Sequence, residues 1–176
     1  NETSGRNSGV VHGGFAYDRG SLKAKLCVEG NKMMGDLAKE LDFHFIRCGK
    51  VLVGNTEEDM ETLKRTMEQG KDNGATNLEL IDEKRLHELV PAVVGKFAMF
   101  SHNSGIVDPF GYTIALAENA HANGVEYHFG CEVTAIRRED DDTYEITTTK
   151  GNFKTRWVVN CAGLGCGKIA DMLGIT

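Results

Sequence analysis

The clearest hydrophobic pattern lies in residues 21–41, where leucines and methionines recur every third or fourth position, as on one face of a helix. Capping residues predict further helices. Thr56 precedes three acidic residues that suit a helix dipole, and Asp108 precedes Pro109, which favours a first helical turn. The helices predicted in this way cover residues 21–41, 56–69, 82–89, 109–124 and 168–173.

Short apolar runs between these helices predict strands. Residues 43–54 contain two such runs around Cys48-Gly49-Lys50 and predict two strands joined by a tight turn. After Gly130, three runs separated by polar turns predict an antiparallel meander. Its acidic turn is most simply a solvated hairpin tip. Single strands are predicted at residues 78–81, 97–101, 125–129 and 156–162. The expected fold class is mixed, α+β.

Composition excludes several classes of protein. The 176 residues are 40% hydrophobic and 26% charged, which is typical of an ordinary globular protein and not of a disordered one. The formal charge of −6 and the lack of a long basic run disfavour nucleic acid as a partner. No apolar stretch approaches the ~20 residues of a transmembrane segment, so a cytoplasmic location is expected. Five cysteines at irregular spacing indicate free thiols.

Two segments rich in glycine carry the candidate chemistry. Residues 3–9, TSGRNSG, combine hydroxyls, an amide and a guanidinium with open backbone, which suits a phosphate and ribose surface, although surface loops share this composition. Residues 156–167 run from an apolar stretch into GLGCG, before a helix that could present N–H groups to a phosphate. A tight turn without a ligand explains GLGCG equally well, because Lys168 stands where G-x-G-x-x-G has its last glycine.

Other chemistry-bearing residues give weaker signals. His12 lies between valines and two glycines, which leaves room for a flat ligand beside its imidazole, although a lone histidine is more often structural. Cys161 and Cys166 have no further ligand pair at metal-site spacing, so no metal is expected. No combination of nucleophile, base and acid favours a hydrolase.

Together these segments resemble the superfamily of D-amino-acid oxidase and glycine oxidase, which are FAD-dependent oxidoreductases. They are most similar to its branch of glycerol-3-phosphate dehydrogenases and L-2-hydroxyglutarate oxidases. The matching stretches are TSGRNSGVVHGG at 3–14, RGSLKAKLCVEGN at 19–31, residues 105–136 and residues 157–175. The resemblance implies parts of a Rossmann-like FAD domain at residues 1–41 and 105–176, and part of a substrate domain with an antiparallel sheet at residues 42–104. It also implies that the first βαβ unit of the FAD domain is not within this chain.

The resemblance also implies roles for individual residues. Contacts with FAD are implied for Thr3, Ser4, Arg6, Asn7, Ser8, Val133, Ala162 and Gly163. His12 is implied to lie near the isoalloxazine ring and is the candidate catalytic base. Arg47 and Lys50 are candidates to pair with an anionic group of the substrate; a solvent-facing position on a strand is the alternative for both.

The activity implied for the intact protein is oxidation of a small anionic secondary alcohol by hydride transfer to FAD. Glycerol 3-phosphate is the leading substrate, and L-2-hydroxyglutarate or an amino acid is the alternative. The electron acceptor stays open. The 176-residue chain alone is expected to bind FAD weakly or not at all and to be inactive, because the first βαβ unit anchors the pyrophosphate. A noncatalytic module that has lost its cofactor is the rival interpretation.

Overall fold

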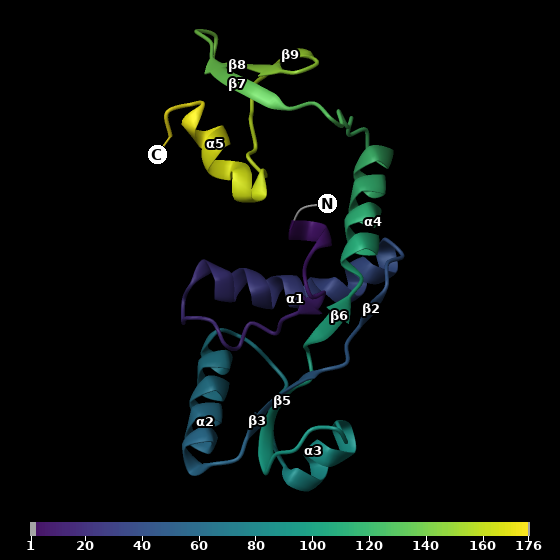
Figure 1. Ribbon diagram of the computed structural model, residues 1–176, viewed down its shortest axis with the longest axis vertical. Coiled ribbons are helices and arrows are strands. Elements are labelled where there is room, and N and C mark those ends of the chain that lie inside the picture. The colour runs from purple at the N-terminus through teal and green to yellow at the C-terminus, as the bar shows by residue number, and fades with distance from the viewer. Residues whose placement is uncertain (1–2, 176) are drawn as a thin grey trace. The chain divides into compact units, whose positions relative to one another are not determined.

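The computed structural model describes residues 3–175, which divide into two compact units, Asn1–Ala122 and Asn123–Thr176. The first unit contains four α-helices, one turn of 3-10 helix and two small antiparallel sheets, and the second contains a meander, one turn of 3-10 helix and a short α-helix (Figure 1). None of the helices within residues 3–175 combines the length and apolar character that crossing a bilayer requires. The predicted division into FAD-domain and substrate-domain portions remains a prediction.

The elements of the first unit largely follow the sequence pattern. Its strands are β1 (Val10–Val11), β2 (Phe45–Ile46), β3 (Lys50–Gly54), β4 (Leu78–Asp82), β5 (Phe97–Ser101) and β6 (Gly105–Val107). Its helices are η1 (Thr3–Gly5), α1 (Leu22–Glu40), α2 (Glu57–Asp72), α3 (Glu83–Leu89) and α4 (Pro109–Ala122). The four helices predicted in this unit are confirmed as α1 to α4, and their observed ends lie within three residues of the predicted ends.

Capping explains where the long helices begin. The Ser21 hydroxyl accepts a hydrogen bond from the Ala24 N–H at 3.1 Å, which fixes the start of α1. Thr56 and Asp59 form a capping box at the start of α2, in which each side chain accepts a hydrogen bond from the other's backbone N–H. These contacts are local in sequence, so the sequence pattern predicts them correctly.

The sheet β3-β5-β4 is buried on both faces. Side chains alternate along its strands, so Met99 on β5 joins an apolar cluster with Leu63 of α2, whereas its neighbour Ala98 joins a second cluster with Leu86 of α3. Helices α2 and α3 therefore cover opposite faces (Figure 1). If β3 slipped by one residue against β5, its side chains would move to the opposite face of the sheet. Burial of both faces therefore fixes the register of β3, including the position of Lys50 at its start.

The predicted hairpin at residues 43–54 is wrong. Both strands exist, but β2 pairs with β6 in the small sheet β1-β6-β2, and β3 pairs with β5. Between them Gly49, at a φ of 78°, donates its N–H to the Ser104 carbonyl at 2.8 Å. The turn is thus bound to the loop after β5, and the chain passes from one sheet to the other.

In the second unit the predicted meander is confirmed, with β7 (Val133–Arg138), β8 (Tyr144–Thr148) and β9 (Gly151–Thr155) paired in sequence order. It is followed by η2 (Gly163–Gly165) and α5 (Cys166–Asp171), which begins two residues earlier than predicted.

The strands predicted at residues 125–129 and 156–162 are not formed in the structure. Apolar side chains in both segments remain exposed: Phe129 is 78%, Trp157 85% and Val159 82% exposed. An apolar run becomes a strand only where a neighbouring backbone supplies ladder hydrogen bonds and a surface to bury its side chains.

Candidate functional site

Residues 3–9 form a turn of 3-10 helix and a loop that Asn7 holds together. The Asn7 side-chain Nδ2 donates to the carbonyls of Thr3 at 3.1 Å and Ser4 at 2.9 Å, and its Oδ1 accepts from the Gly9 N–H at 2.9 Å. The loop is attached to β6, because the Val107 N–H donates to the Gly9 carbonyl at 2.8 Å. The Asn7 amide therefore organises the loop in which it was predicted to contact a cofactor.

Four other residues of this loop point their donors into solvent. The side chains of Thr3, Ser4, Arg6 and Ser8 are exposed and make no hydrogen bond to another residue within 3–175. Hydroxyl and guanidinium donors held on one rigid loop fit an anionic, acceptor-rich group such as the pyrophosphate of FAD. Their predicted contacts with FAD remain a proposal.

His12 follows directly after β1, and two side chains of α1 hold its backbone. The His12 carbonyl accepts hydrogen bonds from Asn31 Nδ2 at 3.0 Å and from Cys27 Sγ at 3.3 Å. Its imidazole is exposed and lies edge-on to the Tyr17 ring, with the ring centroids 6.4 Å apart. The structure thus presents the imidazole on a fixed peptide unit.

The loop after His12 is also held from the side of α2. Gln69 Nε2 donates to the Tyr17 carbonyl at 2.7 Å, and Asn73 Nδ2 donates to the Tyr17 carbonyl at 2.8 Å and to the Gly14 carbonyl at 3.2 Å. Contacts from α1 and α2 together therefore fix residues 12–17.

The ionisable groups around His12 favour their neutral forms. Burial, and then the charges of Lys50 and Lys23, lower the pKa of His12 from its ordinary value of 6.5. Burial raises the pKa of Tyr17 and of the Cys27 thiol. At neutral pH the site therefore offers a neutral imidazole that can accept a proton, beside a neutral phenol and a neutral thiol.

Arg47 is exposed, and its guanidinium is hydrogen-bonded to other residues of the chain. Its Nη1 donates to Asn31 Oδ1 at 3.1 Å and to the Asn103 carbonyl at 2.9 Å, and its Nη2 donates to the Asn31 carbonyl at 3.3 Å. Asn31 is only 4% exposed and connects Arg47 to His12. These contacts give Arg47 a structural role, and its predicted role in substrate binding remains a proposal.

Sequence reasoning missed three residues of this site: Tyr17, Lys23 and Asn31. A signal existed for two of them. Asn31 is a poor helix former in the middle of a predicted helix, and Lys23 is a cation in a first turn that contains no acidic residue. Both residues weaken the helix at these positions. This indicates that their side chains serve contacts outside the helix.

The remaining predicted cofactor contacts lie in the second unit. Val133 begins β7 next to a β-bulge. Gly163 adopts a φ of 55° and has open space around it. The Ala162 N–H donates to Asn160 Oδ1 at 3.2 Å. That these residues contact the same FAD as the loop at residues 3–9 remains a prediction.

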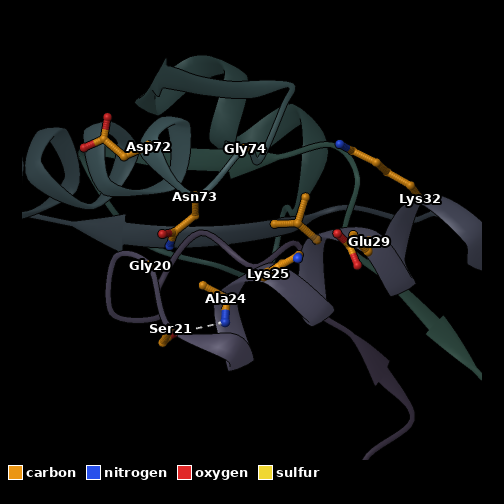
Figure 2. A pocket seen from close by; sticks show the side chains of 10 residues that line it. Gly20, Ser21, Ala24, Lys25, Glu29, Lys32, Asp72, Asn73 and Gly74 are labelled. Carbon is orange, nitrogen blue, oxygen red and sulfur yellow. Dashed lines mark hydrogen bonds between the residues drawn. The ribbon is translucent and has the colours of Figure 1, made fainter.

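Figure 2 shows a separate pocket of about 320 Å³ between the start of α1 and the end of α2. Its lining includes Ser21, Lys25, Glu29 and Asn73, and none of the predicted site residues. Within residues 3–175 no group of three or more histidine, cysteine or acidic side chains could hold a metal ion. All five cysteines are free thiols, as predicted.

Substitution of Gly14 measures how much stability depends on the close approach of the His12 loop to α1. Its φ is 78°, and a Cβ there would overlap Val28 Cγ2. Gly20 has a similar φ of 71° but open space around it, so it is a matched control. Gly20→Ala should cost about 1–2 kcal/mol of unfolding free energy for the left-handed backbone, and Gly14→Ala about 1–3 kcal/mol more for overpacking. Urea unfolding of both variants measures this difference, and equal midpoints would contradict the close packing.

The family model described as DAO, FAD dependent oxidoreductase, matches residues 1–176. A glycerol 3-phosphate dehydrogenase of Caloramator mitchellensis is 38% identical over 98% of this chain and 36% of its own length. A mitochondrial L-2-hydroxyglutarate dehydrogenase of Nematostella vectensis is 33% identical over 97% of this chain and 40% of its own length. The chain thus spans well under half the length of these relatives.

Solved structures agree with this comparison. An L-α-glycerophosphate oxidase from Mycoplasma pneumoniae with FAD bound has a TM-score of 0.88 and 25% identity, covering 98% of this chain and 47% of that one. A glycine oxidase from Geobacillus kaustophilus, 23% identical over 98% of this chain and 48% of its own, shares the fold with a TM-score of 0.86. The chain therefore belongs to the DAO family of FAD-dependent oxidoreductases.

Proposed function

We propose that this chain forms part of an enzyme that oxidises a small anionic secondary alcohol, with glycerol 3-phosphate as the leading substrate, by hydride transfer to FAD. The observation that carries the proposal is the exposed imidazole of His12, which is held neutral on a fixed peptide and has the charges of Lys23 and Lys50 within electrostatic reach. The relative named glycerol 3-phosphate dehydrogenase supports this substrate.

The residues of this chain supply two parts of the chemistry. FAD, when bound, would supply the acceptor for the hydride of the carbinol carbon. His12 accepts the proton of the substrate hydroxyl, for which a neutral imidazole is suited near physiological pH. The exposed donors of Thr3, Ser4, Arg6 and Ser8 bind acceptor oxygens of the cofactor.

L-2-hydroxyglutarate is the second candidate substrate. Several relatives at 30–34% identity are named L-2-hydroxyglutarate dehydrogenase, and this substrate also carries a hydroxyl near an anionic group. An amino acid is a third candidate, supported by the fold that the chain shares with solved structures named glycine oxidase, L-proline dehydrogenase and L-amino acid deaminase.

Anaerobic mixing of the intact, flavin-loaded protein that contains this chain with each candidate separates these proposals. Glycerol 3-phosphate is expected to bleach the oxidised flavin absorbance within seconds, and L-2-hydroxyglutarate and glycine much more slowly. Faster bleaching by L-2-hydroxyglutarate would transfer the proposal to that substrate. An intact protein that carries no flavin, or whose flavin none of the three reduces, would favour the noncatalytic module.

The lowered pKa of His12 predicts the pH dependence. The imidazole accepts a proton only when neutral, so kcat/KM should rise with pH through the His12 pKa, and this rise should lie below pH 6.5. Lys50→Met removes a charge that lowers this pKa, so the rise should move to higher pH. The control is Lys32→Met, because Lys32 is an exposed residue of α1 and is not among the charges that lower the His12 pKa. An unchanged profile in Lys50→Met would contradict the assignment.

A further inference from the structure

Lys23 occupies a position that helix stability does not explain. It lies in the first turn of α1, which contains no acidic residue, and a cation there opposes the helix dipole. The side chain is exposed, and it has no ion-pair partner among residues 3–175. Among the described residues of the first unit, two lysines form ion pairs, Lys39 with Asp36 and Lys64 with Glu61 at 3.0 Å.

Tyr17 positions the Lys23 ammonium beside His12. Lys23 Nζ lies 4.5 Å from the centroid of the Tyr17 ring, a cation–π distance, and the same ring meets the His12 imidazole edge-on at 6.4 Å between centroids. Because α1 and α2 fix the backbone of residues 12–17, this aromatic ring is a stable support for the ammonium.

Lys50 approaches His12 from a different element. It is half-buried at the start of β3, and its Nζ lies 6.0 Å from the centroid of the buried Phe15 ring, three residues after His12. Like Lys23, it lacks an ion-pair partner in the described part of the chain. Both ammonium groups are close enough to lower the pKa of His12.

The charges of both ammonium groups act on one imidazole, so its surroundings disfavour any further positive charge. An anion bound beside these groups would offset their positive charge. We propose that Lys23 and Lys50 together bind the phosphate or carboxylate group of the substrate, beside His12, with Tyr17 as the support for Lys23. This inference rests on the proposed function and adds to it the residues that recognise the anionic end. Arg47, whose guanidinium is bonded to Asn31 and Asn103, is not part of this site.

Binding of inorganic phosphate tests the site without turnover. Calorimetric titration of the intact, flavin-loaded protein should detect phosphate binding in the millimolar range, and Lys23→Met and Lys50→Met should each weaken it about tenfold or more. Lys32→Met, on the same helix as Lys23 but outside the cluster, should bind as the unmodified protein does. Failure of the unmodified protein to bind phosphate, or equal binding by all three variants, would overturn the proposal.

Steady-state kinetics supply the second measurement. Lys23→Met should raise KM for glycerol 3-phosphate about 10- to 100-fold with little change in kcat, because the charge binds ground state and transition state alike. Turnover of glycerol, which lacks the anionic group, should not change at a pH well above the His12 pKa, where the imidazole stays neutral without the Lys23 charge. Equal losses with glycerol and glycerol 3-phosphate would indicate structural damage and overturn the proposal.

The two measurements separate this inference from the proposed function. Lysine-dependent phosphate binding in a protein whose flavin no hydroxy substrate reduces would retain the anion site and reject the proposed function. If glycerol 3-phosphate reduces the flavin but phosphate binding does not depend on either lysine, the proposed function is retained and the anion site is rejected.

Discussion

Replacing His12 by glutamine is expected to slow reduction of the flavin by substrate about 10²- to 10⁴-fold, which is the usual contribution of a general base. Glutamine preserves a polar side chain of similar length but cannot accept a proton in this pH range. The backbone at this position should not move, because Asn31 and Cys27 bind the carbonyl of residue 12 and not its side chain. The loss should therefore appear in chemistry and not in folding.

Anaerobic stopped-flow absorbance measures the rate of flavin bleaching in His12→Gln. The absorbance spectrum of the oxidised flavin and the thermal midpoint of unfolding should match those of the unmodified protein. His87→Gln is the control, because His87 is an exposed residue of α3, which packs on the sheet face opposite to α2. A bleaching rate in His12→Gln within threefold of the unmodified protein would remove His12 from the role of base.

The second large effect is expected on stability. Asn31→Ala should lower the free energy of unfolding by about 2–4 kcal/mol, since it removes two donors and one acceptor from a buried network. The Arg47 guanidinium would lose the Asn31 Oδ1 acceptor, and the carbonyls of His12 and Asn103 would each lose a donor. The His12 carbonyl would then keep only the hydrogen bond from Cys27 Sγ among those from α1.

Chemical unfolding followed by circular dichroism measures this loss. Lys32→Ala, the next residue on α1 and exposed, should change the free energy by no more than about 0.5 kcal/mol. Asn31→Asp keeps an acceptor for Arg47 but replaces the donor with a second oxygen facing the carbonyls of His12 and Asn103, so it should also destabilise. An Asn31→Ala midpoint equal to that of Lys32→Ala would show that the network does not support the fold.

The predictions from sequence succeed where the determining contacts are local. A cap joins residues three apart, as in Ser21 with Ala24 and Thr56 with Asp59, so the starts of the helices can be predicted without the fold. The meander of the second unit follows from short turns between neighbouring strands. The expectation of a hairpin at residues 43–54 is wrong because β2 and β3 pair with the distant strands β6 and β5 and not with each other.

The same division applies to the candidate site. By itself the sequence determined the capped helices, the mixed fold class and the motifs of residues 3–14, because each depends on neighbours within a few positions or on residue type. Only the tertiary structure decided that Asn31 holds the His12 peptide, that Arg47 is bonded within the protein, and that Lys23 and Lys50 share the surroundings of one imidazole. These contacts join α1, β3 and the loop after β1, and hydrogen bonds and charges depend on distances in space that spacing along the chain does not fix.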